Sequence, residues 1–351
     1  MSDQCDVCHS PNETQPLIEV SLLGLISAWI HECKQCGFRQ VRPRLTRRDL
    51  TIIYPDEYFS STSEIGFCDY YRQAQRYERV AYFLAKKVRR LVQSQGRILD
   101  VGCALGFLLH ALRQYTQMNV HGIDISPFAT YFARKKYQLD IECGVLEEIK
   151  FPSKYFDFII QKDVLEHVIN PRMHLLESHR ILRSRGHIWL TTPNGKINLK
   201  PLFSFSHRNK GPHKDEMPLL DQGHLSFFNK GHLLKLFSEC GFECVYMRNI
   251  SVRRGLGHSG ILPWKKKPVR TIHRSRIPSI KKVNDQRNLH SETSPNFHEL
   301  YAKITAEIEK RNNPIRSSVP YFYQRQCSKW LDTLPAPFPI GLDFEFLIRK
   351  I

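Results

Sequence analysis

The sequence lacks long hydrophobic runs, which limits where the protein can act. Its longest apolar stretch near the start, from Leu22 to Ile30, has nine residues and is interrupted by Gly24 and Ser27. A helix that crosses a bilayer needs about 20 apolar residues. Acidic residues and cysteines precede this stretch, whereas a secretory signal peptide has a basic segment there. We therefore expect a cytoplasmic protein.

Acidic side chains are scarce between residues 251 and 287. That stretch holds eleven lysines or arginines and a single acid, Asp285, in a chain of net charge +18. A face this basic favours polyanions. Four uses remain open: binding the diphosphate of an acceptor, docking on an anionic membrane surface, tracking RNA, or remaining a solvated loop. The basic residues concerned are Lys265, Lys266, Lys267, Arg270, Arg274, Arg276, Lys281 and Lys282, with Trp264 and His273 nearby.

The ten cysteines do not indicate a disulfide framework, because cytoplasmic cysteines are mostly thiols or metal ligands. Four of them form two CxxC pairs separated by 24 residues, and Gly37 follows the second pair. Two such pairs can aim four thiolates at one tetrahedral ion. His9 and His31 adjoin the pairs and are alternative ligands. The simplest prediction is a structural zinc site formed by Cys5, Cys8, Cys33 and Cys36.

Helical and strand patterns alternate after the cysteine pairs. Apolar residues recur at helical spacing between about 70 and 95, and apolar strands are expected at 97–101, 120–125 and 156–161. Asn170-Pro171 combines an N-cap with a proline at the first helical position, so a helix should begin there and end before Gly186. The remaining predicted elements are a strand at 187–192, a helix at 231–240, a strand at 243–250, a helix at 297–311 and a last strand within 342–351.

This alternation predicts an α/β fold: a Rossmann-like, seven-stranded, mainly parallel sheet with helices on both faces. The basic stretch before the last strand is interpreted as an insertion. The predicted domains are a zinc-ribbon-like module at 1–45, a linker and helix at 46–95, the main domain at 96–250 with 340–351, and a basic insertion or cap at 251–339.

The segment ILDVGCALGF, residues 98–107, carries the clearest ligand signal. A strand, a glycine turn and a helix in succession present backbone N–H groups to a ligand. A dinucleotide fingerprint needs glycine at 104 and 107, where Ala104 and Phe107 stand, and no GK[ST] follows for a phosphate loop. Asp100 suits a ligand with an amino group, and Asp124 can accept the hydroxyls of a ribose.

These features together describe a site for S-adenosylmethionine, with the adenine between apolar side chains such as Ile125 and Leu146. The predicted cofactor-binding residues are Asp100, Gly102, Ala104, Gly106, Asp124, Ile125, Leu146 and Gln161.

Five segments, ILDVGCALGF, GIDISP, YFDFIIQKDVLEHVINP, LTTPN and GHLSFFNKGHLLKLFSECGF, resemble the class I methyltransferases, in the branch related to ubiquinone-biosynthesis O-methyltransferases. With its cysteine pairs, the chain is further similar to zinc-ribbon methyltransferases associated with sugars and surface polysaccharides. The resemblance covers about residues 1–250 and the last strand. Two positions depart from the pattern: Ala104 replaces a glycine, and CGVLEE lacks the acid that often lies beside the adenine, where Glu147 is a substitute.

The motif KDVLEHV follows the strand at 156–161, at the edge where open α/β sheets hold their ligands. On a helical turn, Asp163 would line up with Glu166 and His167. His167 is a candidate general base. Alternatively, as the resemblance implies, Asp163, Glu166 and His167 bind a divalent cation such as Mg²⁺, or Glu166 and His167 only bond neighbouring loops. The resemblance also places His224 near the acceptor.

The sequence thus predicts methyl transfer from S-adenosylmethionine to a small, anionic acceptor such as a sugar nucleotide or lipid-linked glycan. One alternative is a methyltransferase of RNA or protein, recruited through the zinc module and the basic stretch. Asn194 follows the wrong strand for an adenine-N6 DNA methyltransferase, which weakens a DNA-modifying role. The other alternative is a non-catalytic binding protein.

Overall fold

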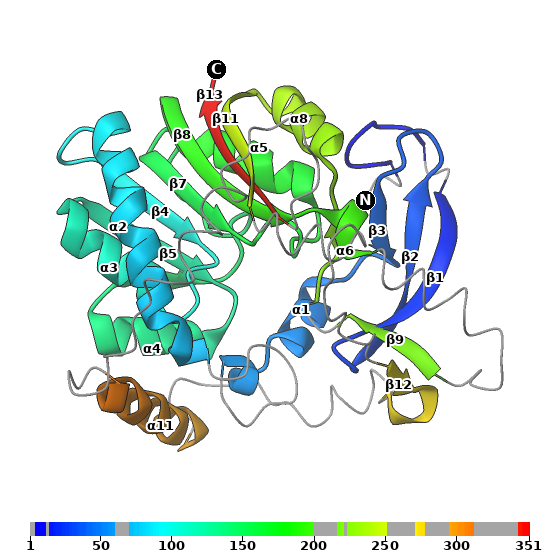
Figure 1. The fold of residues 1–351 in the computed structure, drawn as a ribbon, viewed down its shortest axis with the longest axis horizontal. Helices are drawn as coiled ribbons and strands as arrows, with labels where there is room; N and C mark the ends of the chain where they lie inside the picture. The colour runs from blue at the N-terminus through cyan, green and yellow to red at the C-terminus, as the bar shows by residue number, and fades with distance from the viewer. Residues whose placement is uncertain are drawn as a thin grey trace, which may run out of the picture.

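The structure is a computed structural model that describes residues 4–11, 14–59, 70–199, 216–220, 223–250, 271–277, 295–311 and 343–351. Two sheets lie side by side in it (Figure 1). In the described ranges, no helix is both long and apolar enough to cross a membrane. Lys265, Lys266, Lys267, Arg270, Lys281, Lys282 and Trp264 lie outside these ranges.

The larger sheet confirms the predicted seven-stranded, mainly parallel architecture. Its strand order is β11-β13-β8-β7-β4-β5-β6, and only β13 runs antiparallel to its neighbours β8 and β11. The last strand therefore inserts between two earlier ones (red in Figure 1), as expected for an insertion that separates the final two strands. The strands are β4 (Arg97–Val101), β5 (Asn119–Asp124), β6 (Asp140–Cys143), β7 (Phe156–Lys162), β8 (Leu182–Pro193), β11 (Phe242–Ile250) and β13 (Asp343–Lys350).

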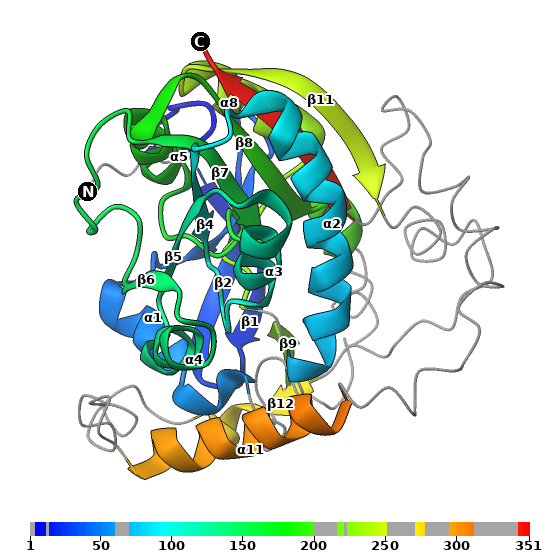
Figure 2. The ribbon, with the colours of Figure 1, turned by 90° about the vertical axis from the view of Figure 1, so that its left-hand side faces the viewer.

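Both faces of this sheet are buried. Successive residues of its strands point to opposite faces and pack into two different hydrophobic cores. In β4, Ile98 packs among the side chains of α2 and α3, whereas Leu99 joins the core with α5 and α8. Ile159 and Ile160 of β7 divide in the same way. Figure 2 shows α2 and α3 against one face. The helices are α2 (Ala74–Leu91), α3 (Phe107–Thr116), α4 (Pro127–Tyr137), α5 (Pro171–Ile181), α6 (Gly195–Asn198) and α8 (Lys230–Glu239).

Local sequence sets where these helices begin. The Asn170 side chain accepts a hydrogen bond from the Met173 N–H, and Pro171 occupies the first turn of α5, as predicted. Ser126 caps α4 in the same way, and Pro127 follows it. Asn229 caps α8 by accepting from the His232 N–H. These caps satisfy N–H groups that a helix leaves without internal partners.

The smaller sheet has the order β10-β3-β2-β1-β9-β12 and is not confined to residues 1–45. Its first three strands come from the predicted cysteine module, but later segments extend it on both sides. The predicted module at 1–45 therefore shares one continuous sheet with later segments of the chain. The strands are β1 (Thr14–Leu22), β2 (Ile26–Cys33), β3 (Arg39–Arg42), β9 (Glu216–Leu220), β10 (Ser226–Phe227) and β12 (Thr271–His273).

Short elements contact the segments that follow β4, β5 and β7, through Tyr54 against His167, Tyr58 near Asp124 and Tyr70 against Phe107. These are α1 (Arg47–Ile53) and the 3₁₀ turns η1 (Asp56–Phe59) and η2 (Tyr70–Gln73), with η3 (Arg274–Arg276) following β12. The helix α11 (Pro295–Arg311) belongs to the predicted insertion and lies below α4 in Figures 1 and 2. Phe297 is fully buried against Phe128 of α4, with ring centroids 5.5 Å apart. Part of the insertion thus folds back on the main domain.

Candidate active site

The glycine turn lies between β4 and α3, and its backbone adopts left-handed conformations. Gly102, Ala104 and Gly106 have φ values of 70°, 50° and 79°. A Cβ on Gly106 would lie 2.9 Å from Ala133 and Leu139, so only glycine fits there. Ala104 is 7% exposed, and its methyl group fits at the position where the resemblance leads one to expect glycine.

Four N–H groups of this turn, those of Gly102, Cys103, Ala104 and Gly106, already have protein partners. Gly102 and Cys103 both donate to the carbonyl of Ile123, at 2.8 and 3.0 Å, and Gly106 donates to that of Cys103. Ala104 donates to Asp124 Oδ2 at 2.8 Å. A phosphate-cradling loop needs such N–H groups to point at its ligand. These four N–H groups are therefore not available to a phosphate, in agreement with the missing P-loop motif.

Two buried carboxylates flank the turn. Asp100 is 3% exposed, and burial together with the nearby charge of Asp124 raises its pKa to about 8, against the opposing effect of Lys162. Burial also raises the pKa of Asp124 to about 6, although it accepts N–H groups from Ala104 and from Ser126 at 2.9 Å. A cationic ligand would relieve the desolvation of both carboxylates.

The other predicted cofactor residues are divided between two cores. Ile125 is partly buried and packs against the core that includes α4, α11 and the short elements α1, η1 and η2. Leu146 is buried on the α5 side of the sheet. Gln161 is fully buried and donates to Ser178 of α5 at 2.8 Å. Glu147, the predicted substitute acid, binds His174 at 3.0 Å.

The residues after β7 form a hydrogen-bonded turn and not the helical turn that was expected. In this turn the His167 N–H donates to the Val164 carbonyl at 2.8 Å. Asp163 accepts from the Thr191 hydroxyl at 2.6 Å and pairs with Lys162. Burial raises the pKa of the Asp163 carboxyl, but Lys162 and Thr191 outweigh this effect and hold the pKa below its usual value.

Glu166, His167 and His224 lie together, so that their ligand atoms are all within 4.8 Å of one another. Glu166 is 1% exposed, and its Oε2 accepts from Thr192 at 3.0 Å. Its Oε1 has no hydrogen-bond partner among the described residues and lies 4.0 Å from His167 Nε2. Burial, followed by the charge of Asp163, raises the pKa of Glu166 well above its usual value.

The two imidazoles meet edge to face, with ring centroids 4.8 Å apart. Burial lowers the pKa of His167 to about 4 and that of His224 to about 3, so both rings are neutral at pH 7. A magnesium site does not fit this arrangement. Mg²⁺ prefers oxygen ligands, whereas the residues that gather offer two imidazoles, and Asp163 of the predicted ligand set is bound to Lys162 and Thr191.

A cluster of tyrosines beside the candidate site was missed by the sequence interpretation, which treated residues 46–69 as a linker. The Tyr54 hydroxyl lies 3.0 Å from His167 Nδ1. Tyr58 is 3% exposed and close enough to Asp124 for that charge to raise its pKa further, beyond the effect of burial. Tyr70 is 7% exposed and donates to the Tyr77 hydroxyl at 2.9 Å. The aromatic density of YPDEYF and of Tyr70-Tyr71 was the available signal.

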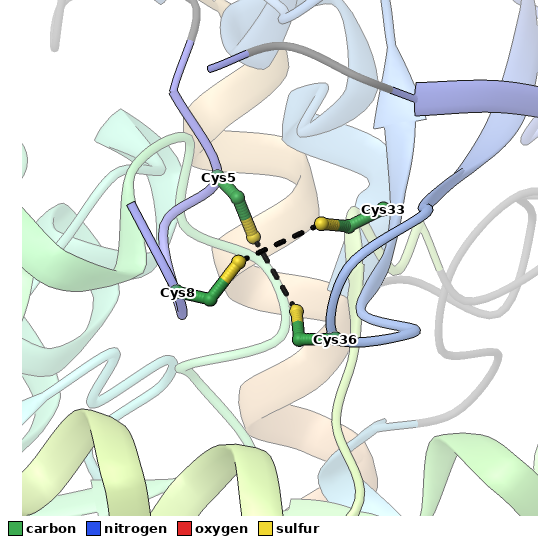
Figure 3. A group of neighbouring side chains, drawn as sticks. All are labelled: Cys5, Cys8, Cys33 and Cys36. Carbon is green, nitrogen blue, oxygen red and sulfur yellow. Dashed lines mark hydrogen bonds between the residues drawn. The ribbon is translucent and has the colours of Figure 1, made fainter. Parts of the chain in front are cut away.

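The four predicted cysteines converge on one point (Figure 3). The Sγ atoms of Cys5 and Cys36 lie 3.7 Å apart, and those of Cys8 and Cys33 lie 3.6 Å apart. A tetrahedral zinc with Zn–S bonds of about 2.3 Å separates its sulfurs by about 3.8 Å. The cluster thus fits zinc. His9 binds Glu239 at 3.1 Å, and His31 binds Thr14 at 3.0 Å.

Comparison with known proteins gives a consistent assignment. Residues 73–247 match the family model described as a methyltransferase domain. A probable S-adenosylmethionine-dependent methyltransferase of Mycolicibacterium smegmatis is 26% identical over 147 residues, which cover 42% of this chain and 51% of that protein. A ubiquinone biosynthesis O-methyltransferase of Rhodopseudomonas palustris is 30% identical over 105 residues, covering 28% and 40%. The chain spans about half the length of these curated relatives or less.

Among solved structures, a putative sarcosine dimethylglycine methyltransferase from Galdieria sulphuraria is 17% identical, with a TM-score of 0.43 and coverage of 78% of this chain and 84% of that one. A methyltransferase from Methanosarcina mazei is 20% identical, with a TM-score of 0.39 and coverage of 48% and 90%. The assignment rests on the family match of residues 73–247. This chain belongs to the methyltransferase family that the matching domain defines.

Proposed function

We propose that the protein transfers the methyl group of S-adenosylmethionine to a small, anionic acceptor such as a sugar nucleotide or a lipid-linked glycan. One observation carries the cofactor part of the proposal. Asp100 and Asp124 are both buried beside a turn in which four N–H groups are already bonded within the protein. Such a site favours a cationic ligand over a phosphate.

S-adenosylmethionine supplies the methyl group on a sulfonium centre when it is bound. Asp100 would accept the ammonium group of the cofactor. Asp124 would accept a ribose hydroxyl, because each carboxylate oxygen has a second lone pair beyond its bond to the backbone. Ile125, next to Asp124 at the start of the following turn, would contact the adenine.

His167 is the proposed base. In the transfer, an acceptor oxygen forms a bond to the methyl carbon, the carbon–sulfur bond breaks, and its electron pair stays on sulfur. His167 would take the proton of the acceptor, and the resulting imidazolium would lie 4.0 Å from Glu166 Oε1. The Tyr54 hydroxyl, 3.0 Å from Nδ1, fixes the ring orientation. Most of the rate enhancement would come from positioning the two reactants.

The acceptor class rests on the resemblance to sugar-associated methyltransferases and on the net charge of +18. Of the basic insertion, Arg274 and Arg276 lie in the described part, and Arg274 pairs with Glu19 of β1. Zinc at the four cysteines would be structural, because all four tetrahedral positions are taken by protein thiolates.

The first experiment is calorimetric titration of S-adenosylmethionine into the wild type and Asp124→Ala, with zinc measured on the same samples. We expect micromolar binding that Asp124→Ala abolishes. No binding by a folded, zinc-loaded wild type would refute the enzymatic function and favour a binding protein.

A second experiment follows transfer of a labelled methyl group to a panel of nucleotide sugars. His167→Gln should bind the cofactor normally but lose transfer by at least roughly 100-fold. His121→Gln is the matched control, because His121 of β5 pairs with Asp140 of β6 and its ring packs against Tyr155 and Phe156 at the amino end of β7. Labelling of RNA with no labelling of any sugar nucleotide would replace the small acceptor with a nucleic acid.

A further inference from the structure

The turn between Cys5 and Cys8 is tied to the turn that carries Glu166 and His167. Arg44 makes a bidentate ion pair with Asp6, with its Nη1 at 2.8 Å from Oδ2 and its Nη2 at 2.9 Å from Oδ1. The same Nη1 donates to the Ile169 carbonyl at 3.1 Å. The side chains of Arg44 and Asp6 are 15% and 6% exposed. One guanidinium thus joins the first cysteine pair to the segment 163–170.

The turn between Cys33 and Cys36 is tied to the segment that carries His224. β3 follows this turn and pairs with β10, and the Val41 N–H donates to the Leu225 carbonyl at 2.8 Å. The N–H groups of Leu225 and Ser226 both donate to the Glu166 carbonyl, at 2.8 and 3.0 Å. Each cysteine pair therefore holds the chain next to a different member of the histidine pair.

We propose that Arg44 is a positioning residue through which the four-cysteine cluster sets the mutual arrangement of His167 and His224. A metal that joins the two cysteine pairs fixes the distance between their turns. Arg44 transmits this constraint to the segment 163–170, and β3 transmits it to residues 224–226. The zinc module would then serve the acceptor side of the active site, while the cofactor side depends on β4, β5 and the glycine turn.

The chemistry of arginine suits this role. Its planar guanidinium can hold a carboxylate with two hydrogen bonds and still donate to a carbonyl, whereas a lysine ammonium acts as a point charge. Removing Arg44 alone would leave the Asp6 carboxylate buried and without its bidentate partner, which itself destabilises a fold. The test therefore needs a variant that removes both charges.

The experiment measures backbone hydrogen exchange by mass spectrometry in wild type, Arg44→Met, and the double variant Asp6→Asn with Arg44→Met. The samples are cofactor-free and loaded with zinc, so the measurement requires no methyl acceptor. In both variants, exchange in residues 163–170 and 223–228 should become at least roughly tenfold faster, while residues 98–107 exchange as in the wild type. Arg44→Lys should recover part of the protection. Chelation of zinc from the wild type should accelerate the same two segments.

Arg183→Met is the matched control. Arg183 also pairs with an aspartate, Asp157, at 2.8 Å, but at the amino end of β7. It should leave exchange in both segments unchanged. Unchanged exchange in the double variant with zinc still bound would overturn the proposal. Equal acceleration throughout the domain, including 98–107, would also overturn it, because that result indicates a general loss of stability.

The relevance of the arrangement to catalysis rests on the proposed function of His167. Calorimetric titration of S-adenosylmethionine distinguishes the positioning role of Arg44 from the proposed function of His167. The double variant should bind S-adenosylmethionine within about twofold of the wild type, since Asp100 and Asp124 are untouched. Failure of the wild type to bind the cofactor would refute the proposed function and leave the exchange result to decide the role of Arg44.

Discussion

Asp100→Asn should stabilise the cofactor-free protein while weakening cofactor binding. Burial and the charge of Asp124 raise the pKa of the Asp100 carboxyl from 3.8 to about 8. Because the folded state holds this proton more tightly than the unfolded state does, the group destabilises the fold above pH 4, and the penalty grows until about pH 8. At about 1.36 kcal/mol per pH unit, the interval from 3.8 to pH 7 corresponds to about 4 kcal/mol.

An asparagine has nearly the same shape and no charge to desolvate, so the variant should recover much of this free energy. For a chain of this size, we expect the midpoint of thermal unfolding at pH 7 to rise by roughly 5–10 °C. At pH 4 the gain should shrink to less than about 1 kcal/mol, because the carboxyl is then protonated in the folded state and roughly half protonated in the unfolded state. Losing a charge-assisted hydrogen bond to the ammonium should weaken S-adenosylmethionine binding by roughly 10- to 150-fold.

The assays are calorimetric unfolding at pH 4 and pH 7 and cofactor titration at pH 7. Asp157→Asn is the control, because Asp157 lies at the amino end of β7, is 20% exposed and pairs with Arg183. It should show neither the stabilisation nor the loss of affinity. An Asp100→Asn variant that is less stable than the wild type at pH 7, or that binds the cofactor with wild-type affinity, would refute the reasoning.

Three further predictions concern the cofactor, the turn and the metal. Because the ionised forms of Asp100 and Asp124 bind a cation, and their pKa values are about 8 and 6, cofactor affinity should rise from pH 6 to pH 8. Binding should also release protons, which titration in buffers of different ionisation enthalpy detects; pH-independent affinity would contradict this. Gly106→Ala should lower the free energy of unfolding by roughly 1–3 kcal/mol in chemical denaturation, through its φ of 79° and a Cβ 2.9 Å from Ala133. Gly223 has a φ of 68°, and a Cβ there would lie 3.5 Å from its nearest neighbour, so Gly223→Ala tests the backbone effect alone. It should lower the free energy of unfolding by less than Gly106→Ala does. Cys8→Ser should lose one zinc per chain by metal analysis and unfold at a lower temperature, and full stability without zinc would count against a structural metal.

The sequence predicted most strands of the larger sheet because they are buried on both faces and appear as apolar runs. β6 was missed, since this edge strand buries only Ile141 among its four residues and so has no apolar run. The strands β9 and β10 were missed for a different reason. β10 has two residues, and its pairing with β3 joins segments nearly 190 residues apart, which no local pattern encodes.

Within the candidate site, the catalytic candidates were predicted from local motifs and from the resemblance, but the partners of their side chains were not predicted. Asp163 was grouped with Glu166 and His167 by spacing, but in the structure it accepts a hydrogen bond from Thr191 and forms an ion pair with Lys162. His224 lies beside His167, with ring centroids 4.8 Å apart, and its place near the acceptor stays a prediction. These assignments depend on which side chains meet after the strands have assembled.

The sequence alone determined most strands and helices of the larger sheet, the glycine turn and the four thiols, because each depends on residues close together in the chain. Only the tertiary structure decided that the cysteine module shares a sheet with residues 216–227 and that Arg44 bridges Asp6 and Ile169. It also decided that tyrosines from residues 54–77 lie beside the candidate site. Such contacts join distant segments, and their geometry is fixed by packing and burial, which a one-dimensional pattern does not contain.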